Sequence, residues 1–130
     1  MMVYILAFGL GVMTWSFLEY AIHRWFGHHK RFQPNFFSKE HLRHHSKGNY
    51  FAPLKKKLLM VTVGFKLSLP LAWFILGFQL GTAWLSGLFM MYLTYEWVHW
   101  RFHNHEGIGF YGRYLRRHHF YHHFVEPKMN

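Results

Sequence analysis

The chain has 130 residues, which fits a single domain, and it combines 52% apolar and 22% aromatic residues with a formal net charge of +10. It contains no cysteine, so disulfide bridges, thiolate metal sites and cysteine nucleophiles are excluded, and any metal must be bound by nitrogen or oxygen. The basic charge is compatible with nucleic-acid binding, whereas the aromatic content is compatible with a membrane protein or a large core.

Two long apolar segments predict helices that span a membrane. Residues 2–20 are apolar nearly throughout, and about twenty helical residues match the roughly 30 Å thickness of a bilayer's hydrocarbon core. Residues 58–95 form a second apolar segment with Lys66 as its one charge. This segment is too long for one span and suits two, with a reversal at residues 77–81, where glycines bracket a lone amide. We therefore expect three spans, at about residues 2–20, 58–76 and 80–97.

The basic residues are concentrated in a linker, residues 23–57, and a tail, residues 98–130, which together hold 14 of the 15 lysines and arginines. With three spans, linker and tail lie on the same side, and the positive-inside rule places both in the cytoplasm. This segregation argues against a soluble protein with buried helices, and no recognition motif supports nucleic-acid binding. A cleaved signal peptide is disfavoured because the first segment lacks a basic start and a small-residue cleavage site.

These patterns predict an all-α integral membrane helical bundle, organised as a single domain over residues 1–130. Its histidine-rich helical cap, formed by linker and tail, is expected on the cytosolic side.

A repeated motif dominates the histidine pattern. HxxHH occurs at His41–His45 and at His119–His123, whereas chance predicts roughly 0.13 copies at this histidine content. Because positions i, i+3 and i+4 share one face of a helix, each motif is predicted to offer up to three imidazoles to one metal centre.

Two further histidine pairs lie at the ends of the predicted spans. His99 and His103 have helical i, i+4 spacing. His23 and His28 are five residues apart, which separates them by about 140° on a regular α-helix, so we expect a break at Gly27 between them.

The number of histidines exceeds what one tetrahedral ion can use, so two metal ions are implied, with iron, zinc, copper and nickel all suited to imidazole. A loose metal buffer is the alternative, but such tracts are repetitive and disordered, whereas these clusters lie at span ends among aromatic residues. We interpret His29, His105 and His118 as spare surface residues.

A weak internal repeat relates the two halves of the chain, because each half has an apolar span, a glutamate, two histidines and then HxxHH. Each half is expected to contribute one side of a shared site. Glu19 precedes His23 and Glu96 precedes His99, so either glutamate could orient a metal ligand through its second ring nitrogen. Pairing of these glutamates with Arg24 or Arg101 is the alternative.

The ordered set HRWFGH, HLRHH, EWVHWRFH and HFYHH resembles the fatty acid hydroxylase superfamily of sphingolipid fatty-acid 2-hydroxylases, sterol desaturases and carotenoid ring hydroxylases. The resemblance covers nearly the whole chain, and it implies a membrane oxygenase with two iron ions in a cytosolic cap above the helices. Zinc could occupy the same positions in a purified sample. The ligands implied by the matched motifs are His23, His28, His41, His44, His45, His99, His103, His119, His122 and His123.

The implied reaction is oxygen-dependent hydroxylation of a lipid C–H bond, with no catalytic residue beyond the metal ligands. Electrons would come from a separate cytochrome b5-like or ferredoxin-like carrier, since the chain has no haem-binding motif. A desaturase on the same centre and a noncatalytic metal-binding membrane protein are the alternatives. Members of the family usually continue past the last HxxHH, so we expect a shortened carboxyl terminus here. Sequence alone does not distinguish the lipid substrate, the attacked carbon, the electron donor or the oligomeric state.

Overall fold

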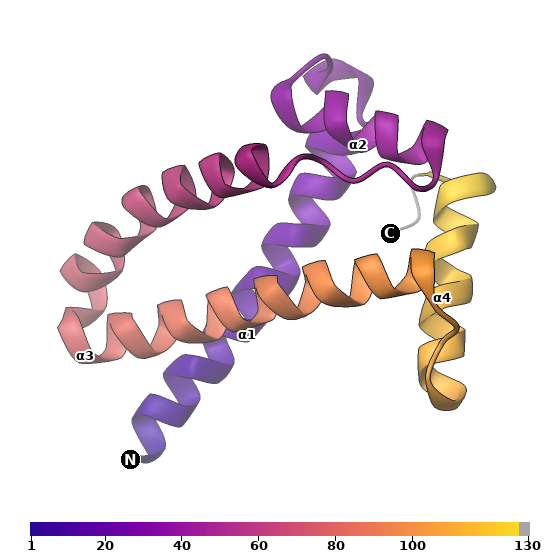
Figure 1. Ribbon diagram of the computed structural model, residues 1–130. Coiled ribbons are helices and arrows are strands. Elements are labelled where there is room, and N and C mark those ends of the chain that lie inside the picture. Colours follow the sequence, from indigo (N-terminus) through magenta and orange to yellow (C-terminus); the bar gives the residue numbers. More distant parts are fainter. Residues whose placement is uncertain (128–130) are drawn as a thin grey trace. The chain divides into compact units, whose positions relative to one another are not determined.

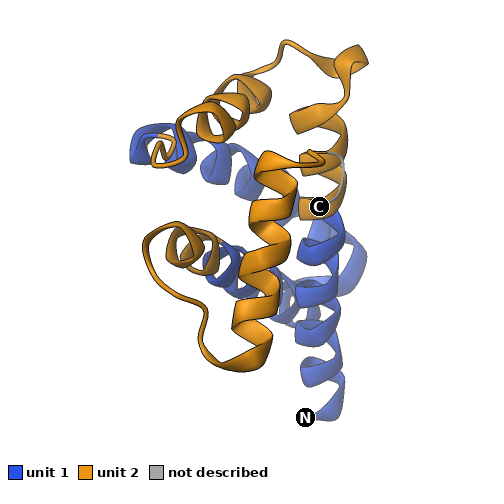
Figure 2. Cartoon of the chain, turned by 90° about the vertical axis from the view of Figure 1, so that its right-hand side faces the viewer, with its two compact units in different colours: residues 1–18, 53–95 blue, residues 19–52, 96–130 orange. Residues whose placement is uncertain are grey.

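The computed structural model describes residues 1–127, and every regular element among them is helical, as predicted (Figure 1). The chain divides into two compact units, one of residues 1–18 and 53–95, the other of residues 19–52 together with those from 96 onward (Figure 2). The elements are α1 (Met2–Ala21), the π-helix η1 (Ile22–His28), the 3₁₀-helix η2 (Lys30–Phe32), α2 (Phe36–Lys47), α3 (Leu54–Asn104) and α4 (Gly109–Phe124).

Helix α3 is a hairpin of two helical arms. Its 51 residues would measure about 76 Å as a straight helix, more than twice the thickness of a bilayer core. Gly77, with φ 75° and ψ 165°, interrupts the helical backbone in a region that favours glycine. Beyond it the arms meet, because Trp73 Nε1 donates to Thr82 Oγ1 at 3.2 Å. The ribbon turns back here (Figure 1), in agreement with the reversal predicted at residues 77–81.

Glycines allow α1 to pack directly on the second arm of α3. A Cβ atom on Gly11 would overlap the carbonyl oxygen of Trp84, and one on Gly87 would overlap the carbonyl oxygen of Phe8. Trp84 Nε1 also donates to Thr14 Oγ1 at 3.2 Å. Small residues that permit backbone contact are typical of helix pairs in membranes, where van der Waals packing replaces the hydrophobic effect as the driving force.

Most of the apolar surface of α1 and α3 is exposed. Both elements are long and apolar enough to cross a membrane. In the most apolar stretch of each, only 11% and 6% of the residues, respectively, are buried. Among the described residues, the buried apolar side chains are Ala21, Ala72 and Leu85. A soluble protein would bury such helices in a core, so this exposure favours lipid as their surroundings.

The helical hydrogen-bonding pattern changes near the start of the second unit. Residues Ile22–His28 continue α1 as a π-helix, so Gly27 lies inside a helical turn, and the predicted break at Gly27 is wrong. A Cβ on Gly27 would lie only 3.0 Å from the ring of His41 and 3.2 Å from Phe37, both on α2. Glycine at this position therefore lets η1 and α2 approach closely.

A capping box fixes the start of α2. The Asn35 side chain accepts a hydrogen bond from the Ser38 amide at 2.8 Å, and Ser38 Oγ accepts one from the Asn35 amide at 2.9 Å. The Asn35 amide group also donates to the carbonyl oxygens of Phe26 and Phe32, each at 2.8 Å. One side chain thus ties the start of α2 to η1 and η2.

The packing of α1 on α3 predicts different effects for two glycines of α1. We expect Gly11→Ala to lower the free energy of unfolding by about 1–3 kcal/mol, because the new methyl group forces the backbones apart. Gly9→Ala is the matched control, since a Cβ there meets nothing within 4 Å, and it should be neutral or stabilising through helix propensity. Thermal unfolding in detergent measures both variants. Equal midpoints for the two would contradict the close packing at Gly11.

Candidate metal centre

The ten histidines matched by the motifs gather into two groups within the second unit. In each group every histidine offers one ring nitrogen as a possible metal ligand, and these nitrogens all lie within 4.8 Å of one another. Group 1 contains His23, His28, His41, His45 and His122, and group 2 contains His44, His99, His103, His119 and His123. The structure therefore brings together every histidine that the sequence selected, and it leaves His29, His105 and His118 outside both groups.

Each HxxHH motif contributes to both groups. In the first motif His41 and His45 belong to group 1 and His44 to group 2, whereas the second motif sends only its middle histidine, His122, to group 1. Each motif is predicted to offer up to three imidazoles to one centre, and the structure gives two to one group and one to the other. The reason is helical geometry, since positions i and i+4 are about 40° apart around the axis but positions i+3 and i+4 are about 100° apart.

The π-helix η1 explains how His23 and His28 reach the same group. Its i→i+5 hydrogen bonding widens the turn, so residues five apart come closer to one face than they would on an α-helix. Their ring planes are inclined by 27°, with centroids 5.3 Å apart.

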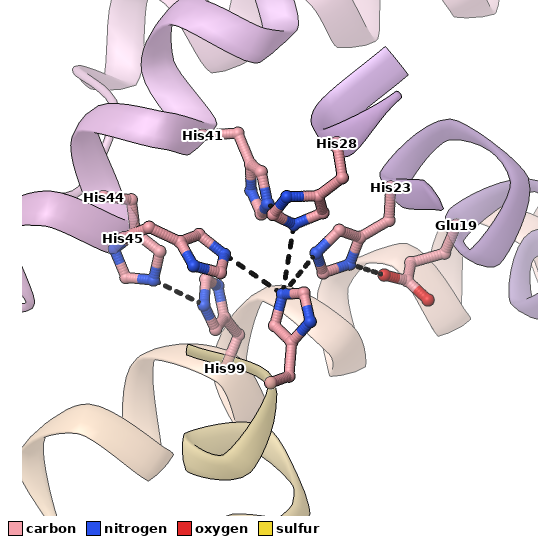
Figure 3. A network of polar contacts seen from close by, with 8 residues as sticks. Glu19, His23, His28, His41, His44, His45 and His99 are labelled. Atoms are coloured by element: carbon pink, nitrogen blue, oxygen red, sulfur yellow. Dashed lines mark hydrogen bonds and ion pairs between the residues drawn. The ribbon is translucent and has the colours of Figure 1, made fainter. Parts of the chain in front are cut away.

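The ring nitrogens of group 1 are too close and too many to be explained by hydrogen bonds alone. His122 Nε2 lies 2.9 Å from Nε2 of His23, 3.0 Å from that of His45 and 3.3 Å from that of His28. Figure 3 shows His23, His28 and His45 directed at this common point. An imidazole nitrogen bears one hydrogen or one lone pair, so one well-directed hydrogen bond is possible and the remaining contacts are repulsive. A cation bound by all of these nitrogens would remove the repulsion.

The distances in both groups fit metal coordination. Two nitrogens bound at about 2.1 Å and at right angles on one ion are about 3.0 Å apart. In group 2, His44 and His99 have their Nε2 atoms 2.9 Å apart, and His103 and His119 have theirs 2.7 Å apart. Both ring nitrogens of His123 are buried without a hydrogen-bond partner among the described residues. A buried nitrogen of this kind is stabilised when its lone pair binds a metal.

The surroundings favour the uncharged form of several grouped histidines. Burial, followed by repulsion from His28, lowers the pKa of His45 to about 3. Burial and neighbouring histidines also lower the pKa values of His41, His119 and His123 well below the ordinary value. At neutral pH these imidazoles therefore have lone pairs available for a metal.

Glu19 contacts one of the candidate ligands, His23. Its Oε1 lies 2.9 Å from Nδ1 of His23, one turn further along the helix (Figure 3). A proton held on Nδ1 by this carboxylate leaves the Nε2 lone pair facing His122. The contact has the geometry expected for an orienting glutamate, and the corresponding role of Glu96 stays a prediction.

A loop that the sequence did not single out orients His44. The carbonyl oxygen of Tyr50 lies 2.5 Å from Nδ1 of His44, so this nitrogen donates and Nε2 faces His99. The Tyr50 hydroxyl donates to Glu40 Oε2 at 2.6 Å, which ties the loop back to α2. Phe51 follows and contacts the ring of His44, with centroids 5.2 Å apart. Residues 50 and 51 lie outside any helical repeat, so periodicity gave no signal for them.

Removal of the Glu19 carboxylate tests the orientation of His23. We expect Glu19→Ala to weaken metal binding by about 10–100-fold, because the Nδ1 proton of His23 loses its acceptor. Glu106→Ala, at an exposed loop position, is the matched control and should leave affinity unchanged. Competition titration against a chromophoric chelator measures both variants. Equal affinities would contradict an orienting role.

Comparison with known proteins identifies the family of the chain. The fatty acid hydroxylase family matches residues 8–130. The chain is 27% identical over 128 residues to the "Ceramide very long chain fatty acid hydroxylase scs7" of Schizosaccharomyces pombe, an alignment that covers 93% of this chain and 37% of that protein. No solved structure matches the chain. Because the family match extends over nearly the whole sequence and includes all ten grouped histidines, the chain belongs to the fatty acid hydroxylase family.

Proposed function

We propose that the chain forms the catalytic domain of an oxygen-dependent hydroxylase that acts on a C–H bond of a lipid acyl chain. The observation that carries this proposal is the pair of five-histidine groups, in which ring nitrogens converge more closely than hydrogen bonds among them can explain. Family membership supplies the reaction class. The two groups can form two adjacent metal sites whose protein ligands are all imidazole nitrogens, a ligand type that suits iron.

The residues of the chain hold and orient the metals. The two groups would bind one iron ion each, and the iron pair would supply oxygen activation and removal of hydrogen from the substrate. Imidazole ligands are neutral, so they add no negative charge to the bound ions. Glu19 and the Tyr50 carbonyl hold the Nδ1 protons of His23 and His44 and so direct the opposite nitrogens inward. The same ligands would also accept zinc in a purified sample.

The substrate is proposed from the relative and from the apolar helices. The S. pombe protein is named for very long chain fatty acids of ceramide, and this chain spans 37% of its length. Helices α1 and α3 expose extensive apolar surface, which suits access of a lipid acyl chain from the bilayer. We infer a lipid with a long acyl chain as the substrate class.

The proposed topology follows from the helices and the charges. Helix α1 and the two arms of α3 would each cross the bilayer, giving three spans at about residues 2–20, 58–76 and 80–97. The basic linker and tail would then lie in the cytoplasm, where a separate carrier protein can deliver electrons.

Lipid analysis tests the reaction. Membrane lipids of host cells with and without the chain are compared under ¹⁸O₂ and under anoxia, and we expect a hydroxyl group containing ¹⁸O only with both the chain and oxygen. His44→Ala and His122→Ala should abolish this product and lower bound metal, because each removes one of the most buried ligands, 4% and 2% exposed.

His105→Ala is the matched control for the histidine variants, since His105 is exposed and outside both groups. It should retain product and metal. A new double bond in place of the hydroxyl group would identify a desaturase instead. Unchanged lipids from a chain that holds two metal ions would identify a noncatalytic protein, and full activity of His44→Ala would refute the assigned site.

A further inference from the structure

Helix α4 carries an exposed aromatic stripe on the face away from its grouped histidines. Phe110, Tyr114, Tyr121 and Phe124 are 82%, 54%, 45% and 68% exposed. With Arg117 between the two tyrosines, their spacings of four, three, four and three residues keep all five side chains on one helical face. We call this set the α4 outer face.

The opposite side of α4 is already occupied. His122 and His123 are buried within the metal groups. Arg116 also turns inward, since its Nε donates to the Phe102 carbonyl oxygen at 2.8 Å and its guanidinium lies over the Phe120 ring at 4.6 Å. Tyr111, near the start of α4, is also exposed, and the other exposed aromatic side chains of the helix all belong to the α4 outer face.

The charged residues of α4 itself are all basic. Residues Gly109–Phe124 include no aspartate or glutamate, and Arg113 and Arg117 are exposed. Arg117 lines a shallow groove of about 320 Å³ with Tyr114, His118 and Tyr121. A groove of this size is at the small end of ligand sites. Its lining is almost entirely apolar, which suits contact with lipid acyl chains beside the exposed arginines.

We propose that the α4 outer face binds the surface of a bilayer that contains anionic phospholipid. Tyrosine and phenylalanine insert favourably at the boundary between headgroups and acyl chains, and arginine at the same level pairs with lipid phosphates. Helix α4 starts five residues after α3 ends, so the short connection keeps the start of α4 near the end of α3. Binding of this kind requires no metal and is independent of the proposed reaction.

The absence of cysteine permits a direct test with the full chain. Tyr121→Cys is labelled with an NBD fluorophore and reconstituted into vesicles of phosphatidylcholine, with or without phosphatidylglycerol. In the anionic vesicles we expect blue-shifted emission. Doxyl-labelled lipid should quench this emission, whereas iodide present on both sides of the bilayer should not. Adding Arg113→Ala and Arg117→Ala should lower the lipid-contacting fraction by about fivefold per arginine.

Lys39→Cys, at an exposed position of α2, is the matched label control and should be quenched by iodide in both vesicle types. Tyr114→Cys provides a second labelled position on the same face if Tyr121→Cys fails to fold. Iodide quenching at positions 114 and 121 equal to that at 39 would overturn the proposal. Equal lipid contact in vesicles with and without phosphatidylglycerol would overturn the assignment to anionic lipid.

Discussion

The convergence of ten imidazoles on two points is the constraint on which the second unit depends. Burial favours the uncharged rings, but uncharged rings with nitrogens about 3 Å apart cannot all satisfy one another by hydrogen bonding. Metal ions would convert this repulsion into binding energy, as in other proteins where ligand assembly and folding are coupled. The contacts of Glu19 with His23 and of the Tyr50 carbonyl with His44 fix which nitrogen of each ring faces the other histidines.

Each half of the chain contributes one histidine to the group that is formed mainly by the other half. Group 1 takes four members from the first half and His122 from α4, whereas group 2 takes four from the second half and His44 from α2. These two residues are also among the most buried in the chain. Neither group is complete until linker and tail fold together, so the repeat seen in the sequence creates one cooperative site in place of two separate ones.

Sequence patterns were sufficient for some levels of this structure and insufficient for others. The all-helical architecture and the reversal near Gly77 follow from apolar length and glycine placement, which are local properties. The ten grouped histidines follow from motif spacing. Spacing on an ideal α-helix could not reveal the π-turn at His23–His28, because that template assumes 3.6 residues per turn. The Tyr50 carbonyl was equally hidden, since any residue type supplies a carbonyl oxygen.

Iron content after anaerobic reconstitution tests the central claim most directly. The purified chain is stripped of metal, loaded with ⁵⁷Fe(II) and washed free of excess ion, and iron is counted per chain while Mössbauer spectra report its ligands. Two irons per chain with nitrogen-rich coordination are predicted from the two histidine groups. One iron per chain, or two irons that His122→Ala and His44→Ala both leave unchanged, would contradict a site built from these groups.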